Sequence, residues 1–406
     1  MAPRPLSVAW ISFFPLEWLP DAPEPLHRIP RRHPASWQRV LVDELAAVPD
    51  LALHIFAVRS HYPQGLRFTR GNANFYCVKV PRGMRTLSLF WWETIMLRRA
   101  LERVKPDLVQ AWGTERGAAL VASRLKYPYL VTMQGLLEWY LEHADLGRYV
   151  RLEAKLEQLS LRRSSFVTAE SKFAMNWLGS HYPNLKLRQV EHAPNWLFHQ
   201  LKRTPLTKPL QFLFVGTLGP LKGADLLMQA LDRLKGELDF HLTIVGNHGQ
   251  HYMKQLSAIS SKALWERVSI LSDLTQEQVA EQMARATILL FPTRADNSPN
   301  AVKEAVVCGL PVVGSGVGGI LDYVLPGLNG LTFRGGELEG FIGAIRTAVA
   351  HPLFGQGKVD QETLAQMRSY LSPARMAEGF LSAYREVSES ALLESEANID
   401  AGRALG

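Results

Sequence analysis

Residues 211–246, QFLFVGTLGPLKGADLLMQALDRLKGELDFHLTIVG, contain the pattern that decides the fold. An apolar run (211–216) ends at a glycine turn, a helical run (224–234) follows, and a second apolar run (240–246) comes next. This order of strand, helix and strand is typical of two parallel strands joined by a crossover helix. The segment therefore predicts an α/β domain with a parallel sheet.

The same alternation extends in both directions along the chain. Downstream it predicts helices at 252–263, 276–285 and 299–308 and strands at 268–271, 287–292, 311–314 and 331–333. Upstream it predicts strands at 6–13, 51–58, 107–111, 129–133 and 165–169, separated by helical segments. One of these segments places Trp37, Val40, Leu41 and Leu45 on one face, and another begins after a Ser171 N-cap. Two Rossmann-like domains in tandem are expected.

A pause in the alternation at residues 193–209, where three prolines flank a polar stretch, predicts the linker between the domains. We expect an N-terminal domain at 1–200 and a C-terminal domain at 201–372. A helix at 373–393 is expected to pack back towards the first domain, and 394–406 form a polar tail that we expect to be disordered. Ligands of parallel sheets bind beyond the carboxyl ends of the strands, so the two domains would face one cleft.

Composition excludes several classes of protein. The 406 residues are 47% apolar and 20% charged, which is typical of a globular protein and not of a disordered or fibrous one. The two cysteines, Cys77 and Cys308, give no disulfide framework or zinc site. No apolar run reaches the roughly 20 residues of a membrane-spanning helix. From this sequence we expect a cytoplasmic protein.

Basic charge is concentrated in the first half. Residues 1–200 hold 26 Lys and Arg against 17 Asp and Glu, whereas residues 201–406 hold 19 against 21. A positive half indicates nucleic acid, an acidic membrane surface or an anionic substrate as a partner, or only a basic solvated surface. We expect no nucleic-acid partner, because the chain carries no recognised binding module.

The stretch 81–105, PRGMRTLSLFWWETIMLRRALERVK, lies in this basic half and surrounds an aromatic and aliphatic centre with arginines. Such a pattern is typical of a helix lying at a membrane interface. A buried helix whose arginines extend to solvent would give the same pattern. We favour peripheral contact with an acidic membrane surface.

The glycine turn after the first quoted strand has the features of a phosphate site. Gly216 ends the strand, and Lys222 immediately precedes a helix whose free N–H groups attract anions. The spacing matches neither G-x-G-x-x-G nor the P-loop, which disfavours a dehydrogenase and a P-loop enzyme. On its own the turn is compatible with a purely structural role.

A second motif, ADNSPNAVKEAVVCG at 295–309, places two carboxylates around a helix start. We expect Ser298 to be the N-cap, Pro299 the first helical residue and Gly309 the stop. The eight-residue separation brings Asp296 and Glu304 to one rim of the sheet. Such a pair can bind sugar hydroxyls or act in acid–base chemistry. Alternatively, Asp296 is a second cap and Glu304 a solvated helix residue.

Taken together, residues 214–333 resemble the donor-binding domain of family 4 glycosyltransferases, retaining enzymes of the GT-B fold. The matching motifs are FVGTLGPLKG in place of the family's G-R-L-x-x-x-K-G, the Glu-x7-Glu region from Asp296 to Glu304, EAVVCGLPVV, and GVGGILDYVLPGLNGL. The first half resembles the family more weakly, through TMQG at 132–135, VTAES at 167–171 and APN at 193–195. The resemblance implies a GT-B fold, with two Rossmann-like domains whose parallel sheets face a cleft.

The resemblance also implies roles for individual residues. Lys222 and the amides of Gly318 and Gly319 would hold the diphosphate of a nucleotide sugar, and Glu304 would bind the ribose. Asp296 and the backbone near Asn297 and Ser298 would contact the transferred sugar. Lys222, Asp296 and Glu304 would thus be the catalytic residues, and Gly216 and Thr217 would belong to the donor site. The chain holds no D-x-D triplet, in keeping with a metal-independent enzyme that needs no cofactor besides its donor.

Departures from the family pattern affect both sides of the expected cleft. Thr217 stands where the family has an arginine, so Arg294 or the other domain would have to supply the missing charge. Gln134 replaces the usual histidine of the TMQG position and can hydrogen-bond a sugar hydroxyl but cannot act as a base. Glu115 follows a strand in the acceptor half and either faces the cleft or caps the next helix.

The sequence thus predicts a retaining glycosyltransferase that moves a sugar from a nucleotide donor to a saccharide or lipid-linked cell-envelope acceptor. It would work in the cytoplasm or at the inner face of the membrane. The alternative, favoured by Thr217 and Gln134, is a catalytically weak or inactive sugar-nucleotide binding protein of the same fold.

Overall fold

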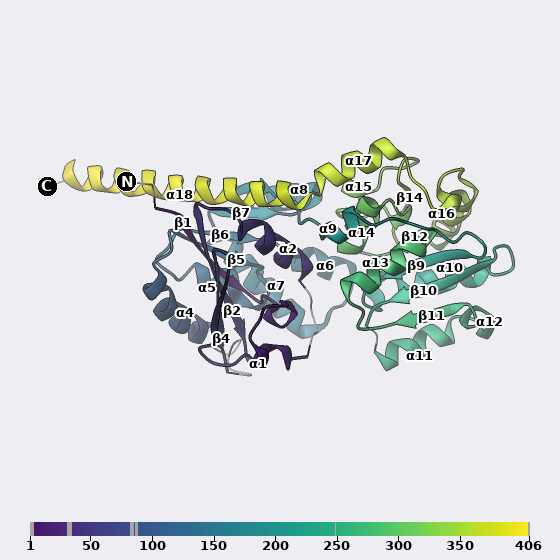
Figure 1. Ribbon diagram of the computed structural model, residues 1–406, viewed down its shortest axis with the longest axis horizontal. Helices are drawn as coiled ribbons and strands as arrows, with labels where there is room; N and C mark the ends of the chain where they lie inside the picture. The colour runs from purple at the N-terminus through teal and green to yellow at the C-terminus, as the bar shows by residue number, and fades with distance from the viewer. Residues whose placement is uncertain (1–3, 31–34, 82–84, 86–87, 248, 405–406) are drawn as a thin grey trace.

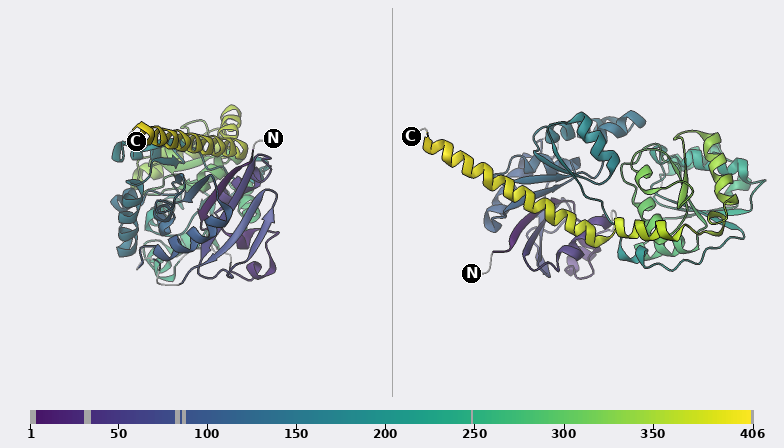
Figure 2. Two further views of the ribbon diagram at one scale, coloured as in Figure 1. Left: turned by 90° about the vertical axis from the view of Figure 1, so that its left-hand side faces the viewer. Right: turned by 90° about the horizontal axis from the view of Figure 1, so that it is seen from above.

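The computed structural model describes residues 4–30, 35–81, 85, 88–247 and 249–404, and for residues 394–404 only the backbone is considered. Two α/β domains lie next to each other along the long axis of the molecule (Figure 1). A long C-terminal helix leaves the C-terminal domain and runs over the N-terminal one (Figures 1 and 2). The expected fold class, two Rossmann-like domains with parallel sheets, is confirmed.

The N-terminal sheet has the strand order β3-β4-β2-β1-β5-β6-β7-β8, and every neighbouring pair is parallel except β3 with β4. Its strands are β1 (Leu6–Ser12), β2 (Leu51–Arg59), β3 (Arg67–Arg70), β4 (Ala73–Lys79), β5 (Leu108–Trp112), β6 (Tyr129–Thr132), β7 (Phe166–Ala169) and β8 (Lys186–Gln189). Alternate residues of central β1 pack into opposite cores, Val8 and Trp10 into one and Ala9 and Ile11 into the other. Burial of both faces is typical of a parallel sheet.

Helices cover both faces of this sheet. They are α1 (Glu24–His27), α2 (Ser36–Leu45), α4 (Trp91–Val104), α5 (Ala118–Ala122), α6 (Leu137–His143), α7 (Gly147–Leu161) and α8 (Lys172–His181), with short 3₁₀ turns η1 (Leu16–Trp18) and η2 (Glu115–Gly117). The predicted Ser171 N-cap of α8 is confirmed, because its hydroxyl accepts a hydrogen bond from the Ala174 amide at 3.0 Å.

The C-terminal sheet has the order β11-β10-β9-β12-β13-β14 and is parallel throughout. Its strands are β9 (Leu210–Val215), β10 (Phe240–Val245), β11 (Val268–Leu271), β12 (Ile288–Phe291), β13 (Val312–Ser315) and β14 (Gly330–Phe333). The helices are α9 (Trp196–His199), α10 (Ala224–Leu234), α11 (Gln250–Ala258), α12 (Lys262–Trp265), α13 (Gln276–Arg285), α14 (Asn300–Cys308), α15 (Ile320–Tyr323), α16 (Leu338–Ala350) and α17 (Gln361–Tyr370), with 3₁₀ turns η3 (Pro220–Lys222) and η4 (Phe354–Gln356).

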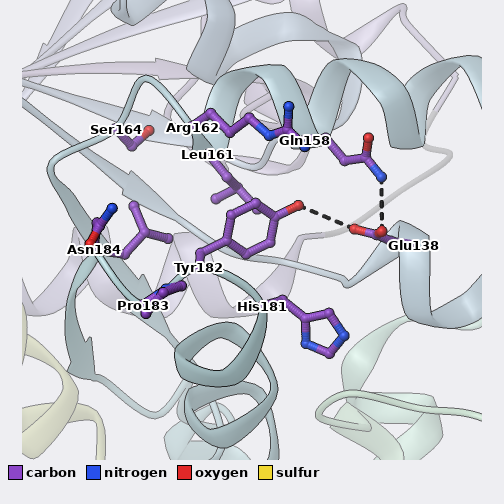
Figure 3. Close-up of a pocket in the computed structure, with 10 residues that line it drawn as sticks. Glu138, Gln158, Leu161, Arg162, Ser164, His181, Tyr182, Pro183 and Asn184 are labelled. Carbon is purple, nitrogen blue, oxygen red and sulfur yellow. Dashed lines mark hydrogen bonds between the residues drawn. The ribbon is translucent and has the colours of Figure 1, made fainter.

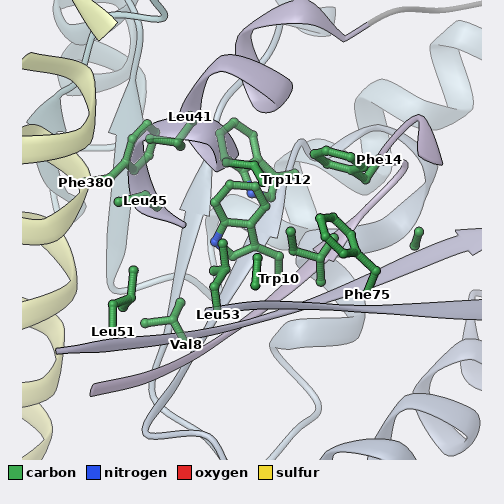
Figure 4. Packing of buried hydrophobic residues seen from close by; sticks show 14 of the residues in the cluster. Val8, Trp10, Phe14, Leu41, Leu45, Leu51, Leu53, Phe75, Trp112 and Phe380 are labelled. Atoms are coloured by element: carbon green, nitrogen blue, oxygen red, sulfur yellow. The ribbon is translucent and has the colours of Figure 1, made fainter. Parts of the chain in front are cut away.

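The last helix, α18 (Pro373–Ala404), packs on the N-terminal domain as expected. Phe380 and Tyr384 belong to the same core as Trp10 and Trp112, and the centre of the Phe380 ring lies 5.5 Å from that of the Trp112 ring, which in turn lies 4.9 Å from that of the Trp10 ring (Figure 4). The helix continues through residues 394–404, so the disorder expected for this tail is wrong. Its sequence, ESEANIDAGRA, contains no proline and a single glycine near its end, and nothing in it ends a helix earlier.

A chain of buried hydrogen bonds joins α18 to the sheet. The Tyr384 hydroxyl accepts a hydrogen bond from Trp10 Nε1 at 3.0 Å and donates one to Gln110 Oε1. Gln110 Nε2 in turn donates to Thr132 Oγ1 at 2.7 Å. Since all four groups are buried, each depends on the others for its partner.

Tyr384→Phe is expected to lower the free energy of unfolding by about 1–3 kcal/mol, because Trp10 Nε1 and Gln110 Oε1 would each lose a buried partner. Urea denaturation measures this loss. Leu392→Ala, on the same helix and 65% exposed, is the control and should stay within about 0.5 kcal/mol of the wild type. Equal stability of the two variants would contradict this role of Tyr384.

Candidate functional site

A cavity of about 690 Å³ lies between the two domains. Its C-terminal wall is made by the segments that follow β9, β10, β11 and β12, at the carboxyl ends of these strands. Its N-terminal wall is made by Trp18, Ser36, Trp37, Gln134 and Tyr140. Of the site residues expected from the sequence, the following line it: Gly216, Thr217, Lys222, Asp296, Ser298, Glu304 and Gln134.

Lys222 forms an ion pair with Asp296 at the bottom of the β9–α10 turn. The Lys222 ammonium donates a hydrogen bond to Asp296 Oδ2 and lies 5.7 Å from the centre of the Phe291 ring. The turn approaches the next loop closely, because a Cβ on Gly223 would lie 1.9 Å from the carbonyl oxygen of Pro292. Only glycine fits this contact and its φ of +68°, so this position fixes where Lys222 enters the cavity.

Arg294, the residue considered as a replacement for the missing arginine, points elsewhere. Its guanidinium makes a bidentate pair with Asp225 of α10, at 2.8 and 2.6 Å, and it is not among the described residues that line the cavity. Its partner Asp225 is itself in the first turn of α10. Thr217 lines the cavity in the place of the family's arginine. Lys222 is therefore the one cation among the described residues that line the cavity.

Glu304 faces the cavity from the middle of α14 and is 9% exposed. Burial raises the pKa of its carboxyl to about 8, an increase that the positive charge of neighbouring Lys303 limits. Lys303 itself is fully buried on the other side of the helix, with its ammonium 3.7 Å from Glu170 Oε2 of the N-terminal domain. Of these two consecutive residues of α14, Glu304 thus lines the cavity and Lys303 contacts the other domain.

The expected N-cap of α14 is wrong. Pro299 occupies the cap position and makes no side-chain hydrogen bond, while Gly309 ends the helix at a φ of +80° as expected. The Ser298 hydroxyl is instead 2.8 Å from the hydroxyl of Tyr323. The Ser298 hydroxyl therefore contacts Tyr323 and does not accept a hydrogen bond from the first amides of α14.

Asn297 joins the two domains and does not line the cavity. It is fully buried, and its Nδ2 donates to Glu170 Oε1 at 3.2 Å, while its Oδ1 accepts from the Ser171 hydroxyl at 3.1 Å. Its backbone amide donates to the Tyr140 hydroxyl at 3.2 Å. Three N-terminal side chains therefore hold the residue next to Asp296.

A second set of polar contacts extends this interface. The Tyr323 hydroxyl donates to Glu191 Oε2 at 2.8 Å and is 3.1 Å from the carbonyl oxygen of Glu170. Within the N-terminal domain, His192 Nδ1 lies 2.7 Å from Glu170 Oε2, the carboxyl group that also faces Lys303 of the C-terminal domain. Asp322 accepts a 2.8 Å hydrogen bond from the Lys172 amide at the start of α8. Charged and polar groups of both domains are thus paired across the interface.

Gly318 and Gly319 pack beneath this loop and do not line the cavity. A Cβ on Gly318 would lie 2.1 Å from the Asp296 carbonyl oxygen, and one on Gly319 would lie 2.0 Å from that of Asn297. The Gly319 amide donates to the Asp296 carbonyl oxygen at 3.1 Å, so this expected phosphate donor is engaged within the protein. The glycines allow two loops to touch at the interface.

On the opposite wall Gln134 lines the cavity and Glu115 lies behind it. The Glu115 carboxylate is packed between two glycines, since a Cβ on Gly113 would lie 2.3 Å from Glu115 Oε2 and one on Gly135 would lie 3.1 Å from Oε1. Burial raises the pKa of Glu115 to about 7. Within the described residues, Glu115 Oε2 accepts no hydrogen bond.

Several lining residues were not expected from the sequence. Trp18 and Trp37 contribute aromatic rings from the N-terminal domain, and Asn247, Asp273, Thr275 and Gln276 form the far end of the C-terminal wall. The positions after β10 and β11 could have been found from the strand-end rule alone. Trp18 and Trp37 could not, because each lies in a segment whose path depends on tertiary packing.

A second hollow, of about 310 Å³, lies within the N-terminal domain (Figure 3). Glu138 accepts hydrogen bonds there from Tyr182 at 3.1 Å and from Gln158 at 2.8 Å, as the dashed lines show. None of the site residues expected from the sequence lines it. The interdomain cavity is therefore the candidate site.

Among the described residues, no helix is both long and apolar enough to cross a bilayer. Within the same part of the chain, no three His, Cys, Asp or Glu side chains gather where they could hold a metal ion.

Two family models match separate parts of the chain. The model described as Glycosyltransferase Family 4 matches residues 20–197, and the model described as Glycosyl transferases group 1 matches residues 209–351. The two matches correspond to the two domains.

Curated relatives match over shorter lengths. An uncharacterized glycosyltransferase of Methanocaldococcus jannaschii is 26% identical over 216 residues, which cover 52% of this chain and 56% of that protein. A D-inositol 3-phosphate glycosyltransferase of Mycobacteroides abscessus is 32% identical over 136 residues, which cover 32% of this chain and 30% of that protein. The chain thus spans about a third to just over half of the length of these relatives.

Solved structures share the whole fold. Sucrose-phosphate synthase of Thermosynechococcus elongatus superposes with a TM-score of 0.77 at 16% identity, over 95% of this chain and 100% of the other. Anabaena HepE, solved in complex with UDP, gives 0.64 at 14% identity, over 94% and 100%. The fold is GT-B, and the matched models together with the two-domain architecture identify this chain as a member of the family 4, group 1 glycosyltransferases.

Proposed function

We propose that this glycosyltransferase is a retaining enzyme that moves a sugar from a nucleoside-diphosphate donor to a saccharide or lipid-linked cell-envelope acceptor. The observation that carries the proposal is the ion pair of Lys222 with Asp296 in a cavity that both domains line. In this proposal the Lys222 cation would stabilise the leaving diphosphate and the neighbouring Asp296 carboxylate would bind sugar hydroxyls. We further propose that neither a metal ion nor a cofactor takes part, and that the protein works in the cytoplasm.

The donor is proposed to occupy the C-terminal wall. Its diphosphate would replace Asp296 as the partner of the Lys222 ammonium, and the freed Asp296 carboxylate would accept hydrogen bonds from the sugar. Glu304 lies in the same wall and would bind the ribose hydroxyls. Because Anabaena HepE was solved with UDP and with UDP-glucose, UDP is the first nucleotide to test.

The acceptor is proposed to lie against Gln134, Trp18 and Trp37, which line the opposite wall. Indole rings suit the apolar faces of sugar rings, and the Gln134 amide can both donate to and accept from a hydroxyl. Glu115 is not among the described residues that line the cavity, so the proposed acceptor contact is assigned to Gln134 and not to Glu115.

In the proposed reaction, the bond between the anomeric carbon and the β-phosphate oxygen breaks and its electron pair stays with the phosphate. The acceptor oxygen bonds to that carbon on the same face, and its proton passes to the departing phosphate oxygen. The main catalytic demand is to stabilise the new negative charge, which Lys222 meets in a site that is closed by two domains. No covalent enzyme intermediate is needed.

A sugar-nucleotide binding protein with little or no activity is the second candidate. It is favoured by Thr217 and Gln134 and by the pairing of Arg294 with Asp225, which leave Lys222 without a second cation. Turnover of UDP-sugars in the presence of a cell-envelope extract separates the two candidates. Tight binding of UDP without any release of UDP from its sugars would favour the second.

Lys222→Met is expected to lower sugar transfer about a hundredfold, because the diphosphate would lose its charged partner. UDP release with a cell-envelope extract as acceptor measures this. Lys235→Met is a matched control, because Lys235 is 33% exposed and paired with Asp232, much as Lys222 is 29% exposed and paired with Asp296. Unchanged turnover in the folded Lys222→Met protein would contradict the phosphate role.

Glu304→Gln is expected to weaken UDP binding several-fold, because an amide NH₂ would replace one of the two carboxyl oxygens available to the proposed ribose hydroxyls. Glu157→Gln is the control: Glu157 is a buried carboxyl outside the cavity whose pKa burial also raises to about 8, so its change should leave UDP affinity unaltered. Calorimetric titration with UDP measures both. Full UDP affinity in Glu304→Gln would remove Glu304 from the donor site.

The raised pKa of Glu304 also predicts a pH effect on stability. The buried carboxyl stays protonated up to about pH 8, whereas in the unfolded chain it ionises near 4.5, so its contribution to stability is lost as the pH rises through this window. Glutamine has no such titration, so the free energy of unfolding of Glu304→Gln minus that of the wild type should rise between pH 5 and pH 8, by up to about 1.4 kcal/mol per pH unit. Melting temperatures of the two proteins across this pH range measure the change. A pH-independent difference would contradict burial of the carboxyl.

A further inference from the structure

Helices α4 and α7 expose apolar and basic side chains on the outside of the N-terminal domain. In α4, Trp91, Trp92 and Ile95 are 50%, 48% and 42% exposed, and Leu89 just before the helix is 46% exposed. In α7, Tyr149, Leu152 and Leu159 are 57%, 40% and 37% exposed. Exposed large apolar side chains that gather in this way mark interaction sites.

The other exposed positions of the two helices are almost all basic. In α4 they are Arg98, Arg99, Arg103 and one acid, Glu102. In α7 they are Arg148, Arg151 and Lys155 together with Gly147, and Arg162 and Arg163 follow directly after the helix. Acidic groups are few beside these basic residues: Glu102 is exposed on α4, and Asp145, just before α7, pairs with Arg151 at 3.0 Å, so the face is predominantly basic.

The two helices belong to one layer. Both pack with α5 over the same face of the sheet, where Leu97 and Leu101 of α4 and Leu156 and Leu161 of α7 share one core. Figure 1 shows α4 on the side of the N-terminal domain that is remote from the C-terminal domain. None of the described residues of α4 or α7 lines the interdomain cavity.

Arg124, at the end of α5, fixes the exposed tryptophan of α4. Its guanidinium lies 4.5 Å from the centre of the Trp91 ring, and its Nη1 donates to the Leu89 carbonyl oxygen at 2.5 Å. Arg98 Nη2 donates to the Arg124 carbonyl oxygen at 3.3 Å. These contacts hold an indole and its neighbouring arginines in place on the surface rather than in the core.

We propose that the outer face of α4 and α7 binds the surface of a membrane that contains anionic lipids. Indole and phenol rings suit the boundary between headgroups and acyl chains, and the arginines would pair with lipid phosphates. The excess of basic over acidic side chains is what favours a lipid surface over a second copy of this chain, because two such faces would repel each other. The side chains of this face reach only the interface, so binding would be reversible.

Membrane binding and sugar transfer are separate properties in this proposal. Binding to vesicles depends only on the α4–α7 face, whereas the use of a lipid-linked acceptor there rests on the proposed function. If the protein binds vesicles but turns over no donor, membrane binding by this face stands and the proposed sugar transfer is wrong.

The test is co-sedimentation of the full chain with vesicles of phosphatidylcholine, with and without phosphatidylglycerol. Binding is expected only to the anionic vesicles and is expected to weaken at high salt. Trp91→Ala/Trp92→Ala should lower the affinity on the order of tenfold. Arg98→Gln/Arg99→Gln should lower it about fivefold for each arginine removed.

Leu206→Ser/Leu328→Ser, in the C-terminal domain, is the matched control, because these leucines are 51% and 45% exposed. It should bind vesicles like the wild type, and all variants should keep the far-UV circular dichroism spectrum and the cooperative thermal unfolding of the wild type, which shows that they are folded. Equal vesicle binding by the wild type and both α4 variants would overturn the proposal. So would a wild-type dimer that the tryptophan variant converts to a monomer without any binding to vesicles.

Discussion

The contacts of Asn297 with the N-terminal domain are the constraint on which the rest of the site depends. This residue follows Asp296 directly, and Glu170, Ser171 and Tyr140 hold its side chain and its amide. A buried amide that is satisfied on both its oxygen and its nitrogen has one low-energy position, since leaving either group unpaired costs about 1–3 kcal/mol. The loop that carries Asp296 is therefore placed by the other domain. The close packing of Gly318 and Gly319 beneath the same loop supports it from below.

The site contains few charged groups that are free to bind a ligand. Lys222 is paired with Asp296, Arg294 is held by Asp225, and Glu304 has its pKa raised to about 8 by burial. The described residues that line the cavity supply one cation, the carboxyl groups of Asp296 and Asp273, and a Glu304 carboxyl that burial favours in its protonated form, so an anionic ligand would have to displace Asp296 from Lys222. The same displacement would free Asp296 for sugar hydroxyls, so a single exchange of partners would prepare both parts of the donor site. The α4–α7 face lies apart from this chemistry and would set only where the enzyme works.

Much of the fold could be predicted because periodicity within a segment determines it. Helices α10 and α13 and strand β11 have the predicted bounds, since their apolar faces and flanking glycine or cap residues are local signals. Strands β3, β4 and β8 were missed, because two of them are short and polar and pair only through tertiary contacts. The cavity-lining positions of Lys222, Asp296 and Gln134 could be predicted because they lie in segments that follow strands, and that of Glu304 because it lies in the helix after β12. The sequence could not show that Asn297 faces the other domain, that Ser298 contacts Tyr323, or that Arg294 is held by Asp225, because those partners are 25 to 157 positions away in the chain.

The central claim is that the N-terminal domain positions the donor loop through Asn297. A double-mutant cycle on UDP affinity, measured by calorimetry for Glu170→Ala, Asn297→Ala and the double variant, tests it most directly. If one contact network holds the loop, each single change already releases it, so the double variant should bind UDP no more weakly than either single variant. Losses that add up independently, or UDP affinities equal to that of the wild type in all three folded variants, would contradict the account.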